Sequence, residues 1–540
     1  MDVHEENDTS VSDKLLRPVR TLVRRSRKLV VCVAIALFIA AAEVLRQAII
    51  AAQRMDAAQS AGAKCSNIPV PPGYWGLKAH ETAAFVDIPN TGAIEAGGTV
   101  CVRVIVPARP SAAPESFTPL PGSAWDSVLL DMVGTSTGIS IPVHLRQVGR
   151  RGRDGAHVYQ ADVRLRDVDV YRPHGHIEFR HALWNPDGIL DPQPFAPERL
   201  ETPEHAQIQV VSHGIRSLEK YMDLPLCTRA DAEGRWVAAA DIPFNVTDQM
   251  MLLPSDNRNR VWMPYDCRMR TVAYREYAQC LAAKYPVVHW FGDSNTRRAL
   301  KKVTSLGQWC STAEEIQSAV CTCNDNMEQF ARYNSNARAM PIDMDAQSGG
   351  VAATSGYLGG PVSGNKSRIV AFKWDGLTDR NQPAWSDPFD RPDGIPAHSS
   401  ELPPAAAVVI GVVNWDTAFS TRAFFASQVQ RLVQKVRESY PESTQIIIRT
   451  GQYYCCTSDM DKFWKRRYSR LRNSHYSSYI VDQFRDQLGP HRVHVWDVAS
   501  LAERRPYAAR DAEINFCPAN HVRSELVDIE NQLLMNAMCN

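Results

Sequence analysis

The sequence predicts an α/β protein in which an N-terminal membrane anchor and an antiparallel β-sandwich precede a three-layer domain built on a parallel sheet. Three observations predict this order. A basic cluster and an apolar run come first, alternating β-type runs occupy residues 81–215, and apolar strands alternate with helices from residue 261 to the end at 540. Lys plus Arg number 60 against 59 for Asp plus Glu, so the chain lacks the basic field that nucleic-acid binding requires.

The anchor is predicted from charge and hydropathy. The apolar stretch LVVCVAIALFIAAA runs from 29 to 42 without a charge, directly after a basic cluster made of Arg17, Arg20, Arg24, Arg25, Arg27 and Lys28. Basic residues on this side hold the N-terminus in the cytosol, which predicts a cytosolic tail at 1–28 and a type II signal anchor at 29–52. A span usually needs about 20 residues, so a cleaved signal peptide and a buried core helix are the alternatives. A short span is typical of early secretory membranes, so we expect a Golgi or other endomembrane protein with a lumenal C-terminal part.

Cysteine usage agrees with a lumenal location. Cys32 lies in the apolar run, and the other 12 of the 13 cysteines follow it. An even set in an oxidising compartment predicts disulfide bonds, although their connectivity is not readable from sequence. The pairs Cys321–Cys323 and Cys455–Cys456 are alternative metal ligands, but no matching histidine spacing surrounds them. Disulfide bonding is therefore the preferred interpretation.

The region from 53 to 260 carries β-type and irregular patterns. Residues 53–80 are predicted to form a stem, and 81–215 a sandwich whose runs GTVCVRVIVP and VYQADVRLRDVDV alternate apolar and polar residues. Proline-rich and glycine-rich breaks between the runs are typical of antiparallel sandwiches. Residues 216–260 have few periodic runs and are predicted to form a connector.

From 261 to 540 the pattern indicates a parallel α/β domain. Strands are expected at VVHWF, RIVAFKW, AAVVIGVV, TQIIIRT and HRVHVWDV, and helices at TRAFFASQVQRLVQKVRESY and YIVDQFRDQLG. The first helix is expected to bury Phe424, Val429, Leu432, Val433 and Val436. Sites in such sheets gather at the carboxyl ends of the strands. Ser294, Asn414 and Thr450 all follow predicted strands.

The insertion between about 303 and 367 contains GGVAATSGYLGGPVSGNKS, which comes within one residue of a phosphate-binding loop. Gly359 and Gly364 fit that motif, but Asn365 replaces its lysine and no clear strand precedes it. We therefore expect a flexible lumenal loop. Asn365 and Asn245 each begin a sequon and are candidate glycosylation sites in the lumen.

Three residues are candidates for acyl-transfer chemistry. Ser294, between an apolar strand and a basic helix, suits a nucleophile at a strand-to-helix turn, or alternatively a helix cap. Asn414 follows a strand and suits an oxyanion donor, or alternatively a turn. His521 precedes a helix with Leu526, Ile529 and Leu533 on one face. It suits a general base, or alternatively an ordinary surface residue.

The motifs around these residues, taken in their order along the chain, resemble those of a known family. VWMPYDCRMR is similar to the family's W-x-P-x-x-C segment, and FGDSNTRRAL, with Arg297 three residues after Ser294, is similar to its G-D-S-x-x-R block. VVIGVVNWD resembles the third block, and His521 with its amphipathic helix and terminal Cys539 resembles the family's ending. The chain from about 260 onward thus resembles the GDS-type, SGNH-like acyl-esterase (PC-esterase) family. That family includes plant wall-polymer O-acetyltransferases, the sialate O-acetyltransferase and the neurexophilin-and-PC-esterase-like proteins.

The resemblance implies an SGNH-like three-layer catalytic domain at 261–540, and an Ig- or filamin-like domain at 81–215 as in the neurexophilin-like branch. It implies Ser294 as nucleophile, His521 as base and Asn414 as oxyanion donor. Gly292 and Asp293 complete the G-D-S block, where Asp293 is expected to shape the turn. Arg297 is expected either to pair with an acidic residue or, as we favour, to have a structural role.

One departure concerns the acid that orients the base. The family usually has an aspartate three residues before the catalytic histidine, and here that position is Pro518. Asp511 or Asp497 are the alternative acids, or His521 works with a backbone carbonyl. The glycine of the family's second block is unassigned among Gly356, Gly359 and Gly360.

The resemblance implies a lumenal O-acyltransferase, most simply an O-acetyltransferase, acting on glycan or polysaccharide hydroxyls. Acetyl-CoA is a candidate donor, and no bound cofactor or metal is expected. The alternatives are a carbohydrate acetylesterase of the same fold and a non-catalytic membrane glycoprotein that binds a glycan or protein partner. Glycosyl transfer ranks last, because acids are only scattered in WDGLTDRNQ.

Overall fold

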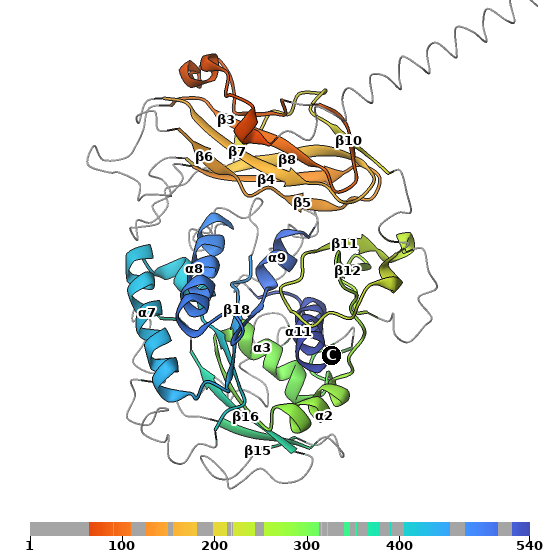
Figure 1. The fold of residues 1–540 in the computed structure, drawn as a ribbon, viewed down its shortest axis with the longest axis vertical. Coiled ribbons are helices and arrows are strands. Elements are labelled where there is room, and N and C mark those ends of the chain that lie inside the picture. The colour runs from red at the N-terminus through yellow and green to blue at the C-terminus, as the bar shows by residue number, and fades with distance from the viewer. Residues whose placement is uncertain are drawn as a thin grey trace, which may run out of the picture.

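The computed structural model describes part of the chain, and the predicted tail, the anchor at 29–52 and the first part of the stem lie outside it. The described residues are 64–89, 91–109, 126–149, 155–180, 198–212, 218, 220–242, 253–312, 315, 321, 340–345, 351–353, 366–374, 376–377, 389, 404–453, 470–505 and 521–540. Among these residues, no helix combines the length and apolar character needed to cross a membrane. The structure is a mixed α/β protein with a largely parallel sheet and mostly antiparallel sheets (Figure 1).

The N-terminal part consists of two sheets. One has the order β1-β3-β7-β6, formed by Phe85–Asp87, Thr99–Val106, His157–Arg164 and Arg146–Val148. The other has the order β2-β10-β8-β4-β5, formed by Gly92–Glu95, Ile208–Val211, Val170–Phe179, Ser127–Gly134 and Ser140–Pro142, with β9 (Glu198–Arg199) on β8. All pairs are antiparallel except β2 with β10. The expectation of a wholly antiparallel arrangement is wrong for that one pair.

The two sheets share one core, so they form a sandwich. Val100, Val102 and Val104 of β3 are fully buried in the same cluster as Leu130 and Met132 of β4. The outer side of β3 is also covered, because a disulfide joins Cys101 to Cys65 in the short helix η1 (Cys65–Asn67). The end of the predicted stem, from residue 64, thus packs on the sandwich rather than leading up to it.

The predicted connector contains a strand that the sequence reasoning missed. Strand β11 (Gly234–Ala238) pairs antiparallel with β12 (Arg260–Pro264), and a disulfide between Cys227 and Cys267 closes the same region. Two short helices, η4 (Tyr221–Asp223) and η5 (Ala239–Asp241), lie beside them in the chain. The segment before residue 261 therefore shares a two-stranded sheet with the start of the next domain.

The C-terminal domain is built on a seven-stranded sheet with the order β15-β14-β16-β13-β17-β18-β19. The five predicted strands are present as β13 (Val287–Gly292), β16 (Lys366–Lys373), β17 (Ala407–Gly411), β18 (Gln445–Arg449) and β19 (Val493–Trp496), all mutually parallel. Strands β14 (Met340–Asp345) and β15 (Val351–Ala353) extend one edge antiparallel and were not predicted. Because β15 lies inside the glycine-rich stretch, the prediction of a loop is wrong there.

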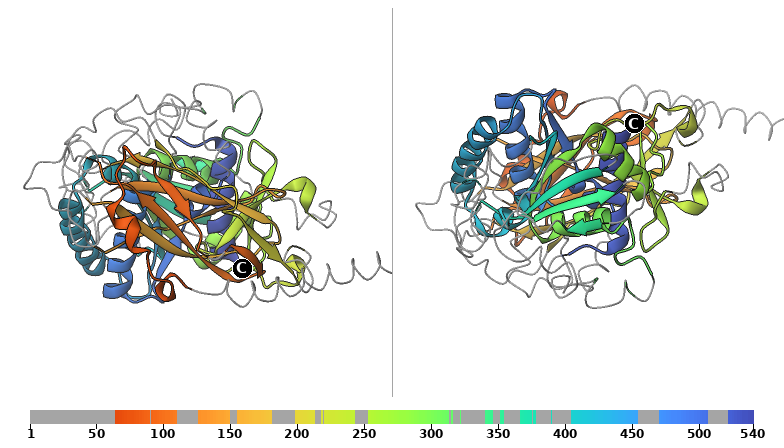
Figure 2. Two further views of the ribbon diagram at one scale, coloured as in Figure 1. Left: turned by 90° about the horizontal axis from the view of Figure 1, so that it is seen from above. Right: turned by 90° about the horizontal axis from the view of Figure 1, so that it is seen from below.

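Helices cover both faces of this sheet and produce three layers (Figures 1 and 2). Alternate residues of β13 show this, since Val288 and Trp290 belong to one core and Val287 and Phe291 to the other. The first core contains α2 (Tyr274–Lys284), α3 (Ser294–Thr304), α9 (Val498–Glu503) and α11 (Ser524–Cys539). The second contains α6 (Val413–Phe419), α7 (Arg422–Ser439) and α8 (Arg470–Leu488). In α7 the buried phenylalanine is Phe425, not the predicted Phe424.

The sandwich rests on the C-terminal domain beside the carboxyl end of β18 (Figure 1). Tyr453, four residues after β18, packs against Leu129 of β4 and Ala502 of α9. At the start of α8, Arg470 donates to the Leu130 carbonyl at 3.4 Å. The two folded parts therefore meet next to the strand ends where the candidate site was predicted.

Four disulfides are present among the described residues. They join Cys65–Cys101, Cys227–Cys267, Cys280–Cys539 and Cys310–Cys321. The prediction of disulfide bonding is confirmed for these eight cysteines, and Cys321 pairs with Cys310 rather than joining Cys323 in a metal site. Cys323, Cys455, Cys456 and Cys517 lie outside the described residues.

Candidate active site

The candidate nucleophile lies at a tight turn between β13 and α3. Strand β13 ends at Gly292 and helix α3 begins at Ser294, as the sequence predicts. Asp293 is the N-cap, and its Oδ1 accepts from the backbone N–H groups of Asn295 at 3.0 Å and Thr296 at 3.1 Å. The alternative in which Ser294 serves only as the helix cap is therefore wrong, because Asp293 performs that role and leaves Ser294 as the first helical residue.

Two strand-end glycines allow α3 to approach the sheet. A Cβ atom on Gly292 would lie 2.3 Å from Thr296 Cβ, and one on Gly411 would lie 2.3 Å from Thr296 Oγ1. In their absence Thr296 Oγ1 donates to the Gly411 carbonyl at 3.1 Å, and the Asp293 N–H donates to the same oxygen at 3.2 Å. The turn that carries Ser294 is thus held against the carboxyl end of β17 by contacts that only glycine permits.

Ser294 and His521 are brought together although 227 residues separate them. His521 Nε2 lies 2.8 Å from Ser294 Oγ, and His521 is buried immediately before α11. This distance falls within the range of about 2.6–3.2 Å expected for a nucleophile and its general base. The alternative of an isolated surface histidine does not fit His521, because this residue is only 7% exposed and is hydrogen-bonded to Ser294.

Asn414 lies in the first turn of α6, three residues after Gly411, and is 4% exposed. Its Oδ1 accepts the backbone N–H of Gln452 at 2.9 Å. Because the oxygen faces Gln452, the Nδ2 donor lies on the opposite side of the amide. Asn414 thus follows β17, whose last residue Gly411 contacts the turn that carries Ser294. The orientation of the Asn414 amide is set by the Gln452 N–H in the loop after β18.

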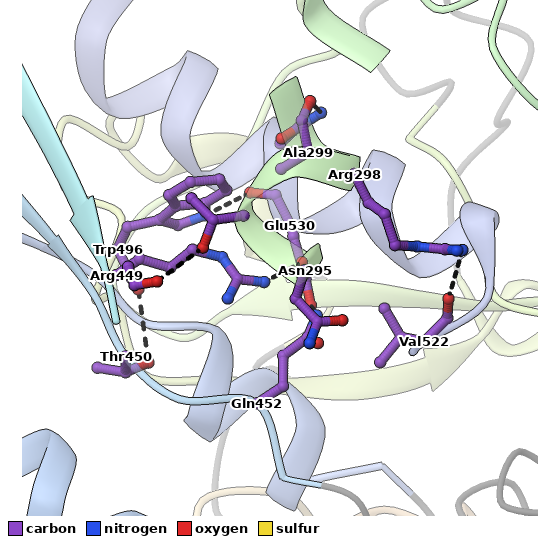
Figure 3. Close-up of polar contacts among 12 residues, drawn as sticks. Asn295, Arg298, Ala299, Arg449, Thr450, Gln452, Trp496, Val522 and Glu530 are labelled. Carbon is purple, nitrogen blue, oxygen red and sulfur yellow. Dashed lines mark hydrogen bonds and ion pairs between the residues drawn. The ribbon is translucent and has the colours of Figure 1, made fainter. Parts of the chain in front are cut away.

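A buried polar network supports this loop, and sequence reasoning missed its members (Figure 3). The Gln452 side-chain amide donates to Glu530 Oε1, and Arg449 donates to Glu530 Oε2 at 2.8 Å. Trp496 Nε1 donates to the Glu530 carbonyl at 2.8 Å. Arg449, at the end of the apolar run III of β18, was a signal that could have pointed to a buried ion pair, whereas α11 carries three acidic residues in ELVDIENQLL and its pattern does not single out Glu530.

Two buried aspartates beside the site have raised pKa values. Burial raises the pKa of Asp293, while the charge of Arg449 and the N–H groups of the α3 turn oppose the increase. Burial also raises the pKa of Asp416 to about 7, against hydrogen bonds from the Ser420 hydroxyl and the Leu377 N–H. These bonds tie α6 to residues just after β16, and the negative charge of nearby Asp293 also raises the pKa of Asp416.

The remaining predicted site residues are distributed as follows. Arg297 lies in α3 and is 7% exposed. Asp497, one candidate acid for His521, is the N-cap of α9 and accepts from the Ser500 N–H and the Thr450 hydroxyl, each at 3.1 Å. The described residues do not include Asp511, Pro518, Asn245, Asn365, Gly356, Gly359 or Gly360.

Within the described part of the chain, no group of three or more His, Cys, Asp or Glu residues is arranged to hold a metal ion. The structure brings a serine and a histidine into hydrogen-bond contact, with an asparagine in the helix after the neighbouring strand and a buried ion-pair network behind it. Such a set can perform proton transfer and stabilise an oxyanion.

Comparison with known proteins adds little. No protein-family model and no curated protein matches the chain. Among solved structures, a cyclomaltodextrinase is 8% identical with a TM-score of 0.12, over 82% of this chain and 66% of that chain. A likeness at this level supports no statement about fold or function.

Proposed function

We propose that this chain is a serine-dependent O-acyltransferase that moves an acyl group, most simply acetyl, onto a hydroxyl of a glycan or polysaccharide. The observation that carries the proposal is the 2.8 Å separation of Ser294 Oγ and His521 Nε2 at the carboxyl edge of a parallel sheet. An alcohol becomes a useful nucleophile when an adjacent base accepts its proton. This pair provides that arrangement.

The proposed reaction proceeds in two steps. His521 Nε2 accepts the proton of Ser294 Oγ, which attacks the carbonyl carbon of the acyl donor. The resulting oxyanion is bound by the Ser294 N–H and Asn414 Nδ2. The intermediate collapses to acyl-serine as His521 returns the proton to the leaving group. A sugar hydroxyl then loses its proton to His521 and attacks the ester, and Ser294 leaves and regains a proton.

The sequence resemblance supports the choice of acyl chemistry and of substrate. The G-D-S block, the asparagine block and the histidine ending occur in the order that the SGNH-like PC-esterase family uses. In the neurexophilin-like branch an Ig- or filamin-like domain precedes the catalytic one, which is consistent with the sandwich before β11. Four disulfides are consistent with a lumenal or extracellular compartment, so we propose an endomembrane location with acetyl-CoA as a candidate donor.

Two alternatives share these observations. A carbohydrate acetylesterase would form the same acyl-serine and pass the acyl group to water. A non-catalytic binding glycoprotein is favoured by Pro518, which replaces the usual acid of the family. The intact pairing of Ser294 with His521 favours an enzyme over the second alternative.

The test uses the full-length chain, purified in mild detergent and exposed to a fluorophosphonate, with intact mass as the readout. We expect one adduct on the wild type and none on Ser294→Ala. His521→Ala should label at least about 10³-fold more slowly. Asn414→Ala should label about 10²–10³-fold more slowly, because one oxyanion donor is removed.

A folded wild-type protein that acquires no adduct would refute the proposal and leave the binding glycoprotein. Where labelling occurs, an acetyl donor separates the remaining readings. Acetylated oligosaccharide indicates transfer, whereas release of acetate at the same rate with and without an acceptor indicates an esterase.

A further inference from the structure

Arg298 is a fully buried guanidinium one helical turn after Ser294 on α3. One of its terminal nitrogens donates to the carbonyl oxygen of Val522 at 2.9 Å and to that of Cys321 at 2.6 Å. Figure 3 shows the side chain reaching from α3 to Val522. Val522 directly follows His521 in the chain. A single side chain therefore connects the helix of the candidate nucleophile to the backbone beside the candidate base.

The surroundings of Arg298 hold it in this position. Its guanidinium lies over the ring of Trp309, with Cζ 5.1 Å from the ring centroid. The Cys310–Cys321 disulfide joins Cys321, which supplies one of the two carbonyl acceptors of Arg298, to Cys310. Ser524, the first residue of α11, donates to the Cys310 carbonyl at 3.0 Å, so Cys310 also binds the start of that helix. A buried cation is tolerated because carbonyl oxygens and an aromatic face surround it.

We propose that Arg298 is a positioning residue that sets the distance between His521 and Ser294 by fixing the backbone of residues 521–522 to α3. The inference rests on the proposed function, because it concerns the same acyl-transfer pair. Residues one turn apart on a helix are about 5.4 Å apart along a rigid axis. The nucleophile and the clamp on its base are therefore carried by one rigid element.

Removing Arg298 should release the His521 backbone from α3 and leave two buried carbonyls without this donor. Misplacement of a catalytic group by about 1 Å can lower a rate about 10²-fold. We therefore expect Arg298→Met to slow fluorophosphonate labelling about 10- to 100-fold. Arg298→Lys, which retains a cation able to donate to both carbonyls, should recover most of the rate.

Lys302 provides a matched control one further turn along α3. It is 1% exposed, donates to the Cys310 carbonyl at 3.3 Å and pairs with Asp528 at 2.8 Å. Lys302→Met removes a buried cation from the same helix and the same disulfide loop, but not a contact to Val522. It should lower stability and leave the labelling rate within about threefold of the wild type.

The experiment measures labelling of the full-length chain over a range of fluorophosphonate concentrations, which separates reagent binding from the chemical step. Arg298→Met and Lys302→Met are each made in the wild type and in His521→Ala, with melting temperatures recorded. If Arg298 acts through His521, Arg298→Met slows the chemical step in the wild type. It should have no further effect once His521 is absent.

Equal slowing by Arg298→Met in both backgrounds, or equal slowing by Lys302→Met, overturns the inference and makes Arg298 a structural residue. If Arg298→Met unfolds below the assay temperature, Arg298→Gln takes its place in the same cycle under the same criteria. A folded wild type that never labels refutes the proposed function, which is distinct from a wild type that labels without depending on Arg298.

Discussion

Two buried glutamates, one in the candidate site and one at the contact between the two folded parts, are held in different ways. Glu530 and Glu178 are each 1% exposed. Glu530 receives an ion pair from Arg449 at 2.8 Å and the amide of Gln452. Glu178 accepts from the Ser127 hydroxyl at 2.6 Å and the Tyr453 hydroxyl at 3.4 Å, and burial raises its pKa to about 7 against these donors and the charge and backbone N–H of Arg470.

The difference teaches that burial alone does not determine the role of a carboxylate. An ion pair with a buried guanidinium compensates the charge of Glu530 and fixes its geometry. For Glu178, burial outweighs its hydroxyl donors and the charge of Arg470, so its pKa of about 7 lets it change protonation near neutral pH. The two groups are joined through consecutive residues, because Gln452 bonds to Glu530 and Tyr453 to Glu178. The loop of Gln452 and Tyr453 therefore binds the ion-paired Glu530 in the site at one residue and the titratable Glu178 at the sandwich at the next.

The largest expected effect comes from breaking the ion pair between Arg449 and Glu530. Glu530→Ala leaves the Arg449 charge buried without its ion pair, so the free energy of unfolding should fall by about 3–5 kcal/mol. Labelling of Ser294 should also slow, because Gln452 loses an acceptor and Asn414 its support. Urea unfolding measures the first effect, with the double variant Arg449→Met/Glu530→Met as the control that should recover most of the stability. A loss below about 1 kcal/mol would contradict a fixed pair.

The second prediction concerns the close packing around Ser294. Gly411→Ala should cost about 3 kcal/mol or more, since its Cβ meets Thr296 Oγ1 at 2.3 Å. Adding Thr296→Ala should recover part of the loss, because the nearest remaining side-chain atom, Thr296 Cβ, lies at 3.3 Å. Gly292→Ala should not be rescued, because its clash at 2.3 Å is with Thr296 Cβ itself. Thermal unfolding of the single and double variants checks this, and rescue of both glycines would contradict it.

The smallest expected effect comes from Glu178, whose pKa lies near neutral pH. The pKa of Glu178 is raised from 4.5 to about 7 in the folded chain, so the stability it provides is complete below pH 4.5. That stability is lost as pH rises to about 7, by at most about 3 kcal/mol. Glu178→Gln mimics the protonated form and should match the wild type at low pH and exceed it above pH 7. Unfolding measured across this range tests it, and a difference that is independent of pH would show that Glu178 does not titrate there.

Local patterns predicted most of the C-terminal domain. All five parallel strands were predicted because each contains an apolar run, although the edge strand β19 exposes His494 on one face. Strand β15 was missed because the glycines and serines around it carry no β-type period, and because β14, which it pairs with a few residues earlier in the chain, was not predicted either. Helix α8 begins at Arg470, nine positions before the segment that was predicted, since the polar residues there are buried against other elements.

Local sequence patterns likewise identified some residues of the candidate site and missed others. Ser294, Asn414 and His521 were identifiable because each follows or precedes a recognisable element and matches a motif. Arg298, Gln452 and Glu530 were not, because their partners lie far away in the chain. The bond from Arg298 to Val522 spans 224 positions, and the bond from Gln452 to Glu530 spans 78.

The sequence by itself determined the class of fold, the turn at Ser294 and the order of the candidate catalytic residues, because hydropathy periods and turn chemistry act over a few neighbouring residues. Only the tertiary structure decided that Asp293 caps α3, that Ser294 and His521 are in hydrogen-bond contact, and that Arg298 donates to the Val522 carbonyl beside His521. Those results depend on packing between segments distant in the chain. The pairing of Glu530 with Arg449 and the raised pKa of Glu178 were likewise decided there, since both follow from the groups that burial brings together.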